Sequence, residues 1–144
     1  MNQPQTDIRA VLKSSGYKLT TQRLAVFNLL KNGDALTMQE IYGQIKHQSD
    51  RASLYRTIKL FEDLGIVQRI NIGWKYKLEL SDKFLVHHHH LSCTKCHRVE
   101  TISESDLEVF INRLAERYSF KPLNHQVEIQ GLCFSCSRLN NNLA

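Results

Sequence analysis

Residues 50–80 read DRASLYRTIKLFEDLGIVQRINIGWKYKLEL, and this stretch decides the fold of the first half of the chain. Leu54, Ile58 and Phe61 recur at i, i+4 and i+7, which predicts a helix over about residues 50–64 with one apolar face. The more exposed positions of this helix include Arg51, Ser53, Tyr55, Arg56 and Lys59. Two strands, residues 66–72 and 75–80, follow the helix and form a hairpin around Gly73-Trp74.

The second strand of this hairpin alternates in polarity. Apolar side chains at 76, 78 and 80 are interleaved with Lys75, Lys77 and Glu79. Because successive side chains of a strand point to opposite faces, we expect one face to be buried and the face with Glu79 to be solvated.

Three shorter helices are predicted before residue 50. Thr6 is the expected cap of the first, and Gly16 ends it. The second has an apolar stripe formed by Leu24, Phe27 and Leu30. The third opens with Thr37 and Glu40, the spacing of a capping box. Helix, turn, helix and basic hairpin is the order of a winged helix-turn-helix, whose recognition helix enters the major groove of DNA.

The charge of the chain is concentrated in the same half. The 144 residues hold 19 Lys+Arg and 14 Asp+Glu, a net charge of +5. Residues 1–84 contain thirteen basic and eight acidic side chains, and residues 85–144 contain six of each. A solvated helix face is the alternative explanation for Arg51, Arg56 and Lys59, but this imbalance and the order of elements favour DNA binding.

The composition restricts the class of protein. Hydrophobic residues make up 42% of the chain and charged residues 23%, which excludes a wholly disordered or low-complexity chain. No uncharged apolar run approaches the roughly 18 residues that cross a bilayer. We therefore expect a cytoplasmic protein that is not associated with a membrane.

Four cysteines form two C-x-x-C pairs in the neutral half, Cys93/Cys96 and Cys133/Cys136. Two such pairs can supply four thiolates to one tetrahedral ion, which closes the shell of a structural zinc site. Disulfides are the alternative, but nothing marks the chain as secreted, and the cytosol keeps thiols reduced. His97 completes a match to the c-type haem attachment motif, a reading that leaves the second cysteine pair without a role.

Four consecutive histidines, residues 87–90, precede the first cysteine pair. In an extended strand His87 and His89 point to one side and His88 and His90 to the other, so one strand could serve two metal sites. Incidental metal affinity of surface histidines is the alternative.

The remainder of the second half predicts a small α/β domain. A helix over residues 103–118 has an apolar stripe made of Leu107, Phe110, Ile111 and Leu114. A strand around Val127 and Ile129 leads to the second cysteine pair. A segment of this size is expected to need zinc and a second copy of the chain for stability. We predict an α+β protein with a winged-helix DNA-binding domain over residues 1–83 and a dimerisation and metal-binding domain over residues 84–144.

With these motifs in view, the sequence resembles the ferric uptake regulator (Fur) family of metal-responsive transcriptional repressors along nearly its whole length. The resemblance lies in Ser53-Leu-Tyr55-Arg56, residues 63–67, the run from 87 to 96, Asn124-His125 and residues 131–136. It implies a winged helix followed by an α/β dimerisation domain. It also implies a homodimer that binds A+T-rich inverted repeats of double-stranded DNA.

The resemblance further implies three metal sites. The structural zinc site consists of Cys93, Cys96, Cys133 and Cys136. The site within the dimerisation domain consists of His87, His89, Glu108 and His125. The interdomain regulatory site includes His88, His90 and, from the hairpin, Glu79.

The regulatory site departs from the family pattern. A short insertion separates Glu79 from the histidines, which makes Asp82 an alternative ligand. The family commonly adds a histidine just before the third helix, but this chain has Asp34-Ala-Leu-Thr37 there. Nitrogen and carboxylate donors do not select among iron, zinc, manganese and nickel.

The function implied by the resemblance is a non-enzymatic repressor of metal uptake and homeostasis genes, with iron or zinc as the divalent co-repressor. Two other classes of function fit parts of the sequence. A metal store or chaperone would take up metal without salt-dependent affinity for duplex DNA. An enzyme could hold an open metal at the His and Glu residues, but no nucleophile or proton-transfer group accompanies them.

Overall fold

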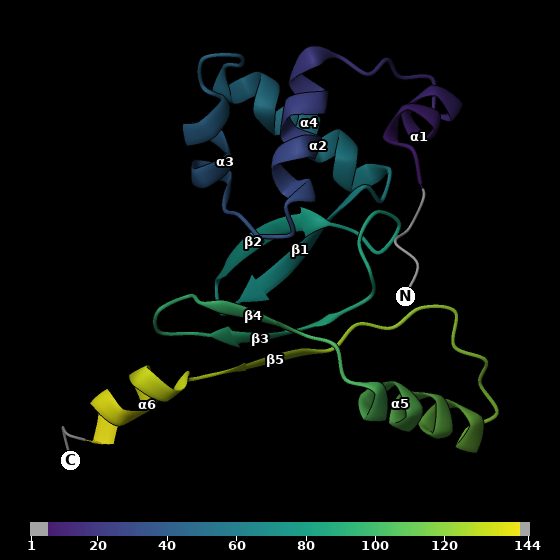
Figure 1. The fold of residues 1–144 in the computed structure, drawn as a ribbon, viewed down its shortest axis with the longest axis vertical. Coiled ribbons are helices and arrows are strands. Elements are labelled where there is room, and N and C mark those ends of the chain that lie inside the picture. The colour runs from purple at the N-terminus through teal and green to yellow at the C-terminus, as the bar shows by residue number, and fades with distance from the viewer. Residues whose placement is uncertain (1–5, 142–144) are drawn as a thin grey trace. The chain divides into compact units, whose positions relative to one another are not determined.

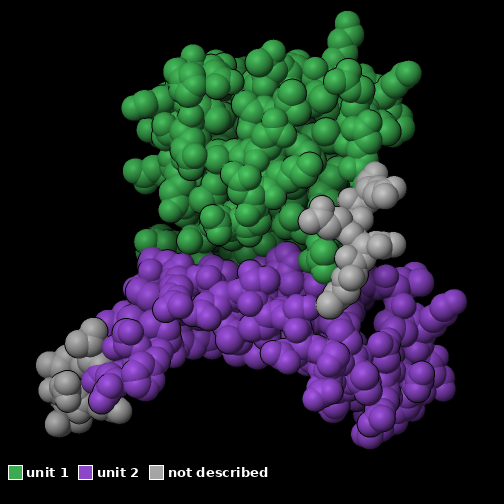
Figure 2. Space-filling view, in the orientation of Figure 1, with its two compact units in different colours: residues 1–86 green, residues 87–144 purple. Residues whose placement is uncertain are grey.

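The structure of the chain, a computed structural model, describes residues 6–141, except for the side chains of residues 139–141. It has the predicted α+β fold (Figure 1). The chain divides into two compact units, residues 1–86 (unit 1) and residues 87–144 (unit 2), which Figure 2 distinguishes by colour. This division falls close to the domain boundary that the sequence predicts after residue 83.

Unit 1 begins with four helices: α1 (Ile8–Ser14), α2 (Thr21–Lys31), α3 (Met38–Ile45) and α4 (Arg51–Asp63). Side chains cap all four N-termini by accepting a hydrogen bond from a backbone N–H of the first turn. The capping box at the start of α3 is confirmed. The predicted cap of α1 at Thr6 is wrong, because the next residue, Asp7, accepts the hydrogen bond from the Arg9 N–H at 2.9 Å.

The hairpin of unit 1 consists of β1 (Val67–Ile72) and β2 (Lys75–Leu80), paired antiparallel. Gly73 has a φ of 61°, a left-handed conformation that favours glycine in the turn. Glu79 was expected on the solvated face, but its side chain is buried. That expectation is wrong because Gln68, directly opposite on β1, donates a 2.7 Å hydrogen bond to the Glu79 carboxylate and satisfies it inside the protein.

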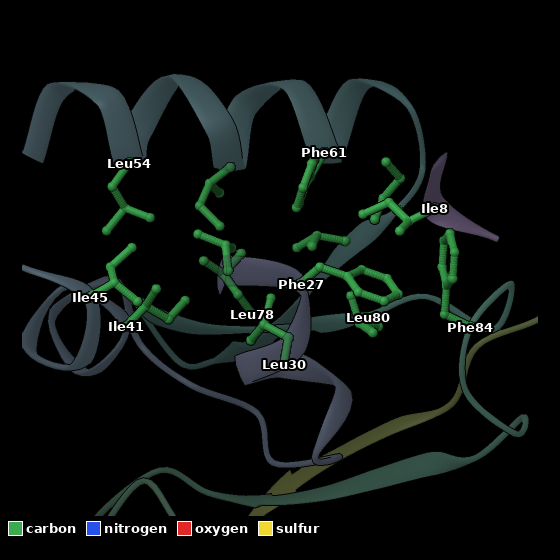
Figure 3. Packing of buried hydrophobic residues seen from close by; sticks show 14 of the residues in the cluster. Ile8, Phe27, Leu30, Ile41, Ile45, Leu54, Phe61, Leu78, Leu80 and Phe84 are labelled. Carbon is green, nitrogen blue, oxygen red and sulfur yellow. The ribbon is translucent and has the colours of Figure 1, made fainter. Parts of the chain in front are cut away.

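One apolar cluster forms the core of unit 1 between α4 and the hairpin (Figure 3). Leu54, Ile58 and Phe61 are buried in it, as the periodicity of residues 50–64 predicts. The inner face of α2 differs from the prediction: Leu24 is 38% exposed, and Val26 is buried together with the predicted Phe27 and Leu30. Phe27 packs edge-on against Phe84, at 5.1 Å between ring centroids, and this tertiary contact helps to set the face of α2 that turns inward.

Unit 2 contains a three-stranded sheet in the order β4-β3-β5. The central strand β3 (His89–Cys93) pairs antiparallel with β4 (Val99–Ile102) and parallel with β5 (Glu128–Gly131). Helix α5 (Ser105–Arg117) lies between β4 and β5 in the chain, and α6 (Phe134–Asn141) follows β5. The sequence predicted β3, α5 and β5. It did not predict the four-residue β4 or α6, whose first turn carries Cys136.

Unit 2 has little apolar core of its own. Among its described residues, the buried side chains are those of His89, His90, Ser92, Cys93 and Cys136. The predicted apolar stripe of α5 is present, but none of its side chains is buried, and Phe110 is 62% exposed. The interior of unit 2 is therefore made of thiol and imidazole groups rather than aliphatic side chains.

Candidate metal centres and nucleic-acid interface

The first candidate metal centre gathers the four cysteines of unit 2. Cys93 ends β3, Cys96 follows three residues later, Cys133 directly precedes α6, and Cys136 lies in its first turn. Their four sulfur atoms all lie within 4.8 Å of one another, and the Cys96 and Cys133 Sγ atoms are 3.8 Å apart. Four sulfurs at about 2.3 Å from a tetrahedral zinc ion would be separated by about 3.8 Å, so the donor set fits a closed zinc shell. All four cysteines are free thiols, and the disulfide alternative finds no support.

Electrostatics within the cysteine cluster favour a bound cation. Hydrogen bonds from the backbone N–H groups of Cys133 and Cys96 lower the pKa of Cys93 to about 6. Burial raises the pKa of Cys136 to about 12, and hydrogen bonds with the neighbouring cysteine side chains act in the same direction with a smaller effect. One thiol therefore ionises readily while ionisation of its neighbour is opposed. A divalent cation relieves this opposition because it neutralises the thiolate charge that accumulates at the cluster.

The second candidate centre joins β3 to α5 and to the loop before β5. It consists of His87, His89, Glu108 and His125, whose ligand atoms lie within 4.8 Å of one another. The Nε2 atoms of His87 and His125 are 3.0 Å apart, and the Nε2 atom of His89 lies 2.7 Å from the Glu108 carboxylate. His125 Nε2 is 3.2 Å from the other oxygen of Glu108. Three imidazole nitrogens and a carboxylate thus converge on one point.

Glu108 is held in its charged form. Burial opposes ionisation of this carboxyl, but the hydrogen bonds from His89 and His125 outweigh it and lower the pKa of Glu108. Nitrogen and carboxylate donors of this kind suit zinc, iron and other transition metals. The residues present therefore fit a divalent metal.

His90 in β3 and His88, just before this strand, form a second pair of histidines. Their rings pack edge to face with centroids 4.8 Å apart, and the rings of His87 and His89 pack in the same way on the other side. The division of the four histidines into two pairs is confirmed. Glu79 lies in unit 1 and the histidines lie in unit 2, so their assignment to one regulatory site stays a prediction.

The candidate nucleic-acid interface is the outer face of α4. Tyr55 is 57% exposed, and Arg51, Arg56 and Lys59 are also exposed. Arg51 stacks over the ring of Tyr42, at 4.6 Å from its centroid. Lys59 forms a 2.6 Å ion pair with Asp63, so part of its positive charge is compensated within the helix. Ser53 is half-buried, and its hydroxyl is engaged with Asp50 and Arg56.

Two further residues adjoin this face. A shallow hollow beside α4 is lined by Tyr55, Arg56 and Lys59 together with Tyr17 and Arg23. Arg23 stacks over Tyr17 at 5.6 Å and donates a hydrogen bond to the Lys18 carbonyl oxygen, so it links α2 to the loop after α1. No pattern in the sequence singles out this pair. The tyrosine after Gly16 and the arginine on α2 could have been found only by knowing which helix the loop approaches.

Comparison with known proteins connects these sites to a family. Residues 14–130 match the model of the ferric uptake regulator family. The chain belongs to that family. Fur family proteins are metal-responsive, non-enzymatic transcription regulators, which agrees with the presence of two donor clusters and a helix-turn-helix in this chain.

Fur proteins of several bacteria are similar over most of the chain. The ferric uptake regulation protein of Bacillus subtilis (strain 168) is 34% identical over 137 residues, which cover 90% of this chain and 92% of that protein. The ferric uptake regulation protein of Legionella pneumophila is 34% identical over 131 residues, which cover 87% of this chain and 95% of that protein.

Solved Fur structures share the fold. The Vibrio cholerae ferric uptake regulator superposes with a TM-score of 0.73 at 28% identity, over 88% of this chain and all of that chain (100%). The Helicobacter pylori Fur, a protein with three functional metal binding sites, has a TM-score of 0.79 at 22% identity. That second match covers 95% of this chain and 97% of the other, and it is a likeness of fold. No helix within residues 6–141 is both long and apolar enough to span a bilayer.

Proposed function

We propose that this chain is a cytoplasmic, homodimeric transcriptional repressor that binds specific duplex DNA when it holds a divalent metal. The observation that carries the proposal is the presence, in one Fur family chain, of an exposed basic helix and two convergent donor clusters. The proposed repressor would control genes of metal uptake and homeostasis, and it would bind A+T-rich inverted repeats as operators. Neither a metal store nor a chaperone has a use for the basic recognition helix.

The cysteine cluster is proposed as the structural zinc site. A closed shell of four sulfurs has no open position for water or substrate, so its role is to hold residues 93–96 and 133–136 together. Because unit 2 has little buried apolar surface, this crosslink would replace a hydrophobic core.

The His87, His89, Glu108 and His125 cluster is proposed as the second metal site, for Fe2+ or Zn2+, with Mn2+ and Ni2+ as alternatives. Glu108 comes from α5 and His125 from the loop before β5, whereas His89 begins β3 and His87 lies two residues before it. Binding here would therefore fasten α5 to the central strand.

The regulatory site is proposed to include His88, His90 and Glu79, with Asp82 as the alternative carboxylate. Leu36 pairs with Leu78 in an isolated β-bridge, so the segment Asp34–Thr37, which carries no histidine, runs beside β2 close to Glu79. Within unit 1 the proposed donors are therefore carboxylates. Ligands from both units would let a cation favour one placement of the winged helix. A shift from 1:99 to 99:1 between two placements requires about 5.5 kcal/mol of differential binding.

The proposed dimer is supported by the apolar face of α5. Phe110 and Leu114, one turn apart on this face, are 62% and 42% exposed, although they are large apolar side chains. A contiguous exposed apolar face of this kind marks an interaction surface. A second copy of the chain would bury it and would place two recognition helices on the two halves of an inverted repeat.

The test compares metal-loaded and metal-stripped protein at fixed ionic strength. Zinc is retained in both samples, verified by elemental analysis, and only the exchangeable metal is removed by mild chelation. We expect a large loss of affinity for a duplex selected from a random library by the Mn2+-loaded protein, and recovery when metal is returned. Equal affinity of the two samples would refute the switch, and metal uptake without salt-dependent duplex affinity would indicate a metal store.

A further inference from the structure

Three side chains at the start of α4 form a hydrogen-bonded chain, which we call the capping relay: Asp50, Ser53 and Arg56. One carboxylate oxygen of Asp50 accepts the backbone N–H of Ser53 at 2.8 Å, which caps the helix. The other accepts the Ser53 hydroxyl, also at 2.8 Å. The Ser53 Oγ in turn accepts a hydrogen bond of 2.9 Å from Nη2 of Arg56.

The direction of the capping relay is fixed by chemistry. A carboxylate can only accept and a guanidinium can only donate, so the hydroxyl between them must give its proton to Asp50 and offer a lone pair to Arg56. The two hydrogen bonds from Ser53, its backbone N–H first, lower the pKa of Asp50 and keep this carboxylate charged. The relay therefore carries a charge at each end, and its hydrogen bonds all run in one direction, from Arg56 through Ser53 to Asp50.

The capping relay orients a side chain that is otherwise free to move. Arg56 lies on the exposed face of α4, where a long side chain samples many rotamers. One of its five N–H donors is used by Ser53, which leaves the others for a bidentate contact. Ordering a flexible side chain on binding reduces affinity, so an arginine that is already ordered binds its partner more tightly.

We propose that Asp50 is a positioning residue for DNA recognition, which acts through Ser53 to hold Arg56 in the orientation that reads a base edge. This inference rests on the proposed function. It predicts an effect opposite in sign to that of charge alone. An acidic group near a DNA-binding face repels phosphates, so its neutralisation should tighten binding unless the acid also orders a contact.

The test variant is Asp50→Asn, which is nearly isosteric. Its amide oxygen can still cap α4, but an NH2 group replaces the oxygen that accepts the Ser53 hydroxyl. The matched control is Asp7→Asn, which removes the same charge from the N-cap of α1 in the same unit, where the carboxylate accepts the Arg9 backbone N–H. Asp50→Ser is a second variant, because its hydroxyl can cap the helix but offers no carboxylate to Ser53. Thermal unfolding verifies that all variants are folded.

Affinity is measured by fluorescence anisotropy, at fixed ionic strength, with the Mn2+-loaded protein. The probes are a duplex that the wild-type protein selects from a random library and a shuffled duplex of equal composition. We expect Asp50→Asn and Asp50→Ser to weaken binding to the selected duplex about threefold per half-site, or about tenfold for a dimer, and to leave the shuffled duplex unaffected. Asp7→Asn should leave affinity for both duplexes unchanged or slightly higher.

The outcomes separate the inference from the proposed function. If both Asp50 variants bind the selected duplex as tightly as Asp7→Asn does, or if they lose equal affinity for both duplexes, Asp50 has no positioning role. If the wild-type protein enriches no duplex at all, the proposed function itself is refuted, and the inference is refuted with it.

Discussion

Replacement of Cys96 by serine should unfold unit 2 and leave unit 1 folded. Cys96 lies in the turn after β3, and its Sγ atom is 3.8 Å from that of Cys133 beside α6. The thiolates of the cluster are the groups that can connect these two segments through an ion. The variant Cys96→Ser removes one of the four and opens the shell to water.

The size of the effect follows from the composition of the two interiors. No aliphatic, Phe, Tyr or Trp side chain of unit 2 is buried among its described residues, whereas fifteen such side chains are buried in the unit 1 cluster. Each buried side chain of this kind supplies about 1.5–3 kcal/mol. Ordering the backbone costs about 1–2 kcal/mol per residue, and structural zinc contributes about 10–16 kcal/mol in zinc-finger peptides. Within one protomer, unit 2 therefore has no buried apolar side chains that could stabilise its fold once zinc is lost.

The assay is circular dichroism at 222 nm with parallel zinc determination. Because α5 and α6 have 13 and 8 residues, a minority of the helix in the chain, unfolding of unit 2 should remove about a third of the helical signal. The rest should melt as a separate transition that chelators do not affect. Ser135→Ala, a change between Cys133 and Cys136 that removes no sulfur, is the control and should keep both zinc and signal. A Cys96→Ser protein with undiminished helix after zinc loss would refute the reasoning.

Three further perturbations test the rest of the molecule. Arg56→Ala should weaken binding to the selected duplex by about 1–3 kcal/mol per half-site, and Tyr55→Phe by less. Unchanged affinity in both variants would mean that other residues recognise the DNA. Phe61→Ala should lower the free energy of unfolding of unit 1 by about 3–5 kcal/mol in urea titration, since Phe61 is fully buried, while zinc stays bound; a loss under about 1 kcal/mol would contradict the core of Figure 3. The third concerns pH. The Thr37 backbone N–H lowers the pKa of Glu40. The ionised carboxylate therefore makes its full contribution to the free energy of unfolding above its usual pKa of 4.5, and this contribution is lost as the pH falls through the lowered pKa. Over that pH range the free energy of unfolding of Glu40→Gln should fall less than that of the wild type, by about a few tenths of a kcal/mol because the group is exposed. If the two free energies of unfolding fall in parallel with pH, Glu40 makes no such contribution.

Much of unit 1 could be predicted because its signals are local. The periodicity of Leu54, Ile58 and Phe61 and the capping box of Thr37 depend on residues within two turns of helix, and the structure confirms both. Leu24 and Glu79 were assigned to the wrong environment because their burial depends on partners distant in sequence. Phe84 packs against α2, and Gln68 hydrogen-bonds Glu79 across the hairpin.

The candidate sites divide in the same way. The two cysteine pairs are visible as spacing, and strand alternation separates the four histidines into two pairs. Spacing does not show that Glu108 and His125 meet His89, because the long connection through α5 hides which side chains approach the strand; the family resemblance supplied these two. The capping relay was not foreseen, since the periodicity of residues 50–64 places Ser53 and Arg56 on the exposed face of the helix but identifies no side-chain partner for either.

The four consecutive histidines of residues 87–90 offer two imidazoles on each side of the segment, and this affects how the segment tolerates a change in length. One residue inserted or deleted between His90 and Cys93 would turn the run over and exchange the imidazoles offered to Glu108 for those on the other side. Two residues would restore the original faces. Because all four positions of the run are histidine, one inserted residue would still present two imidazoles toward Glu108, those of His88 and His90 in place of His87 and His89, as long as Cys93 stays anchored by its sulfur.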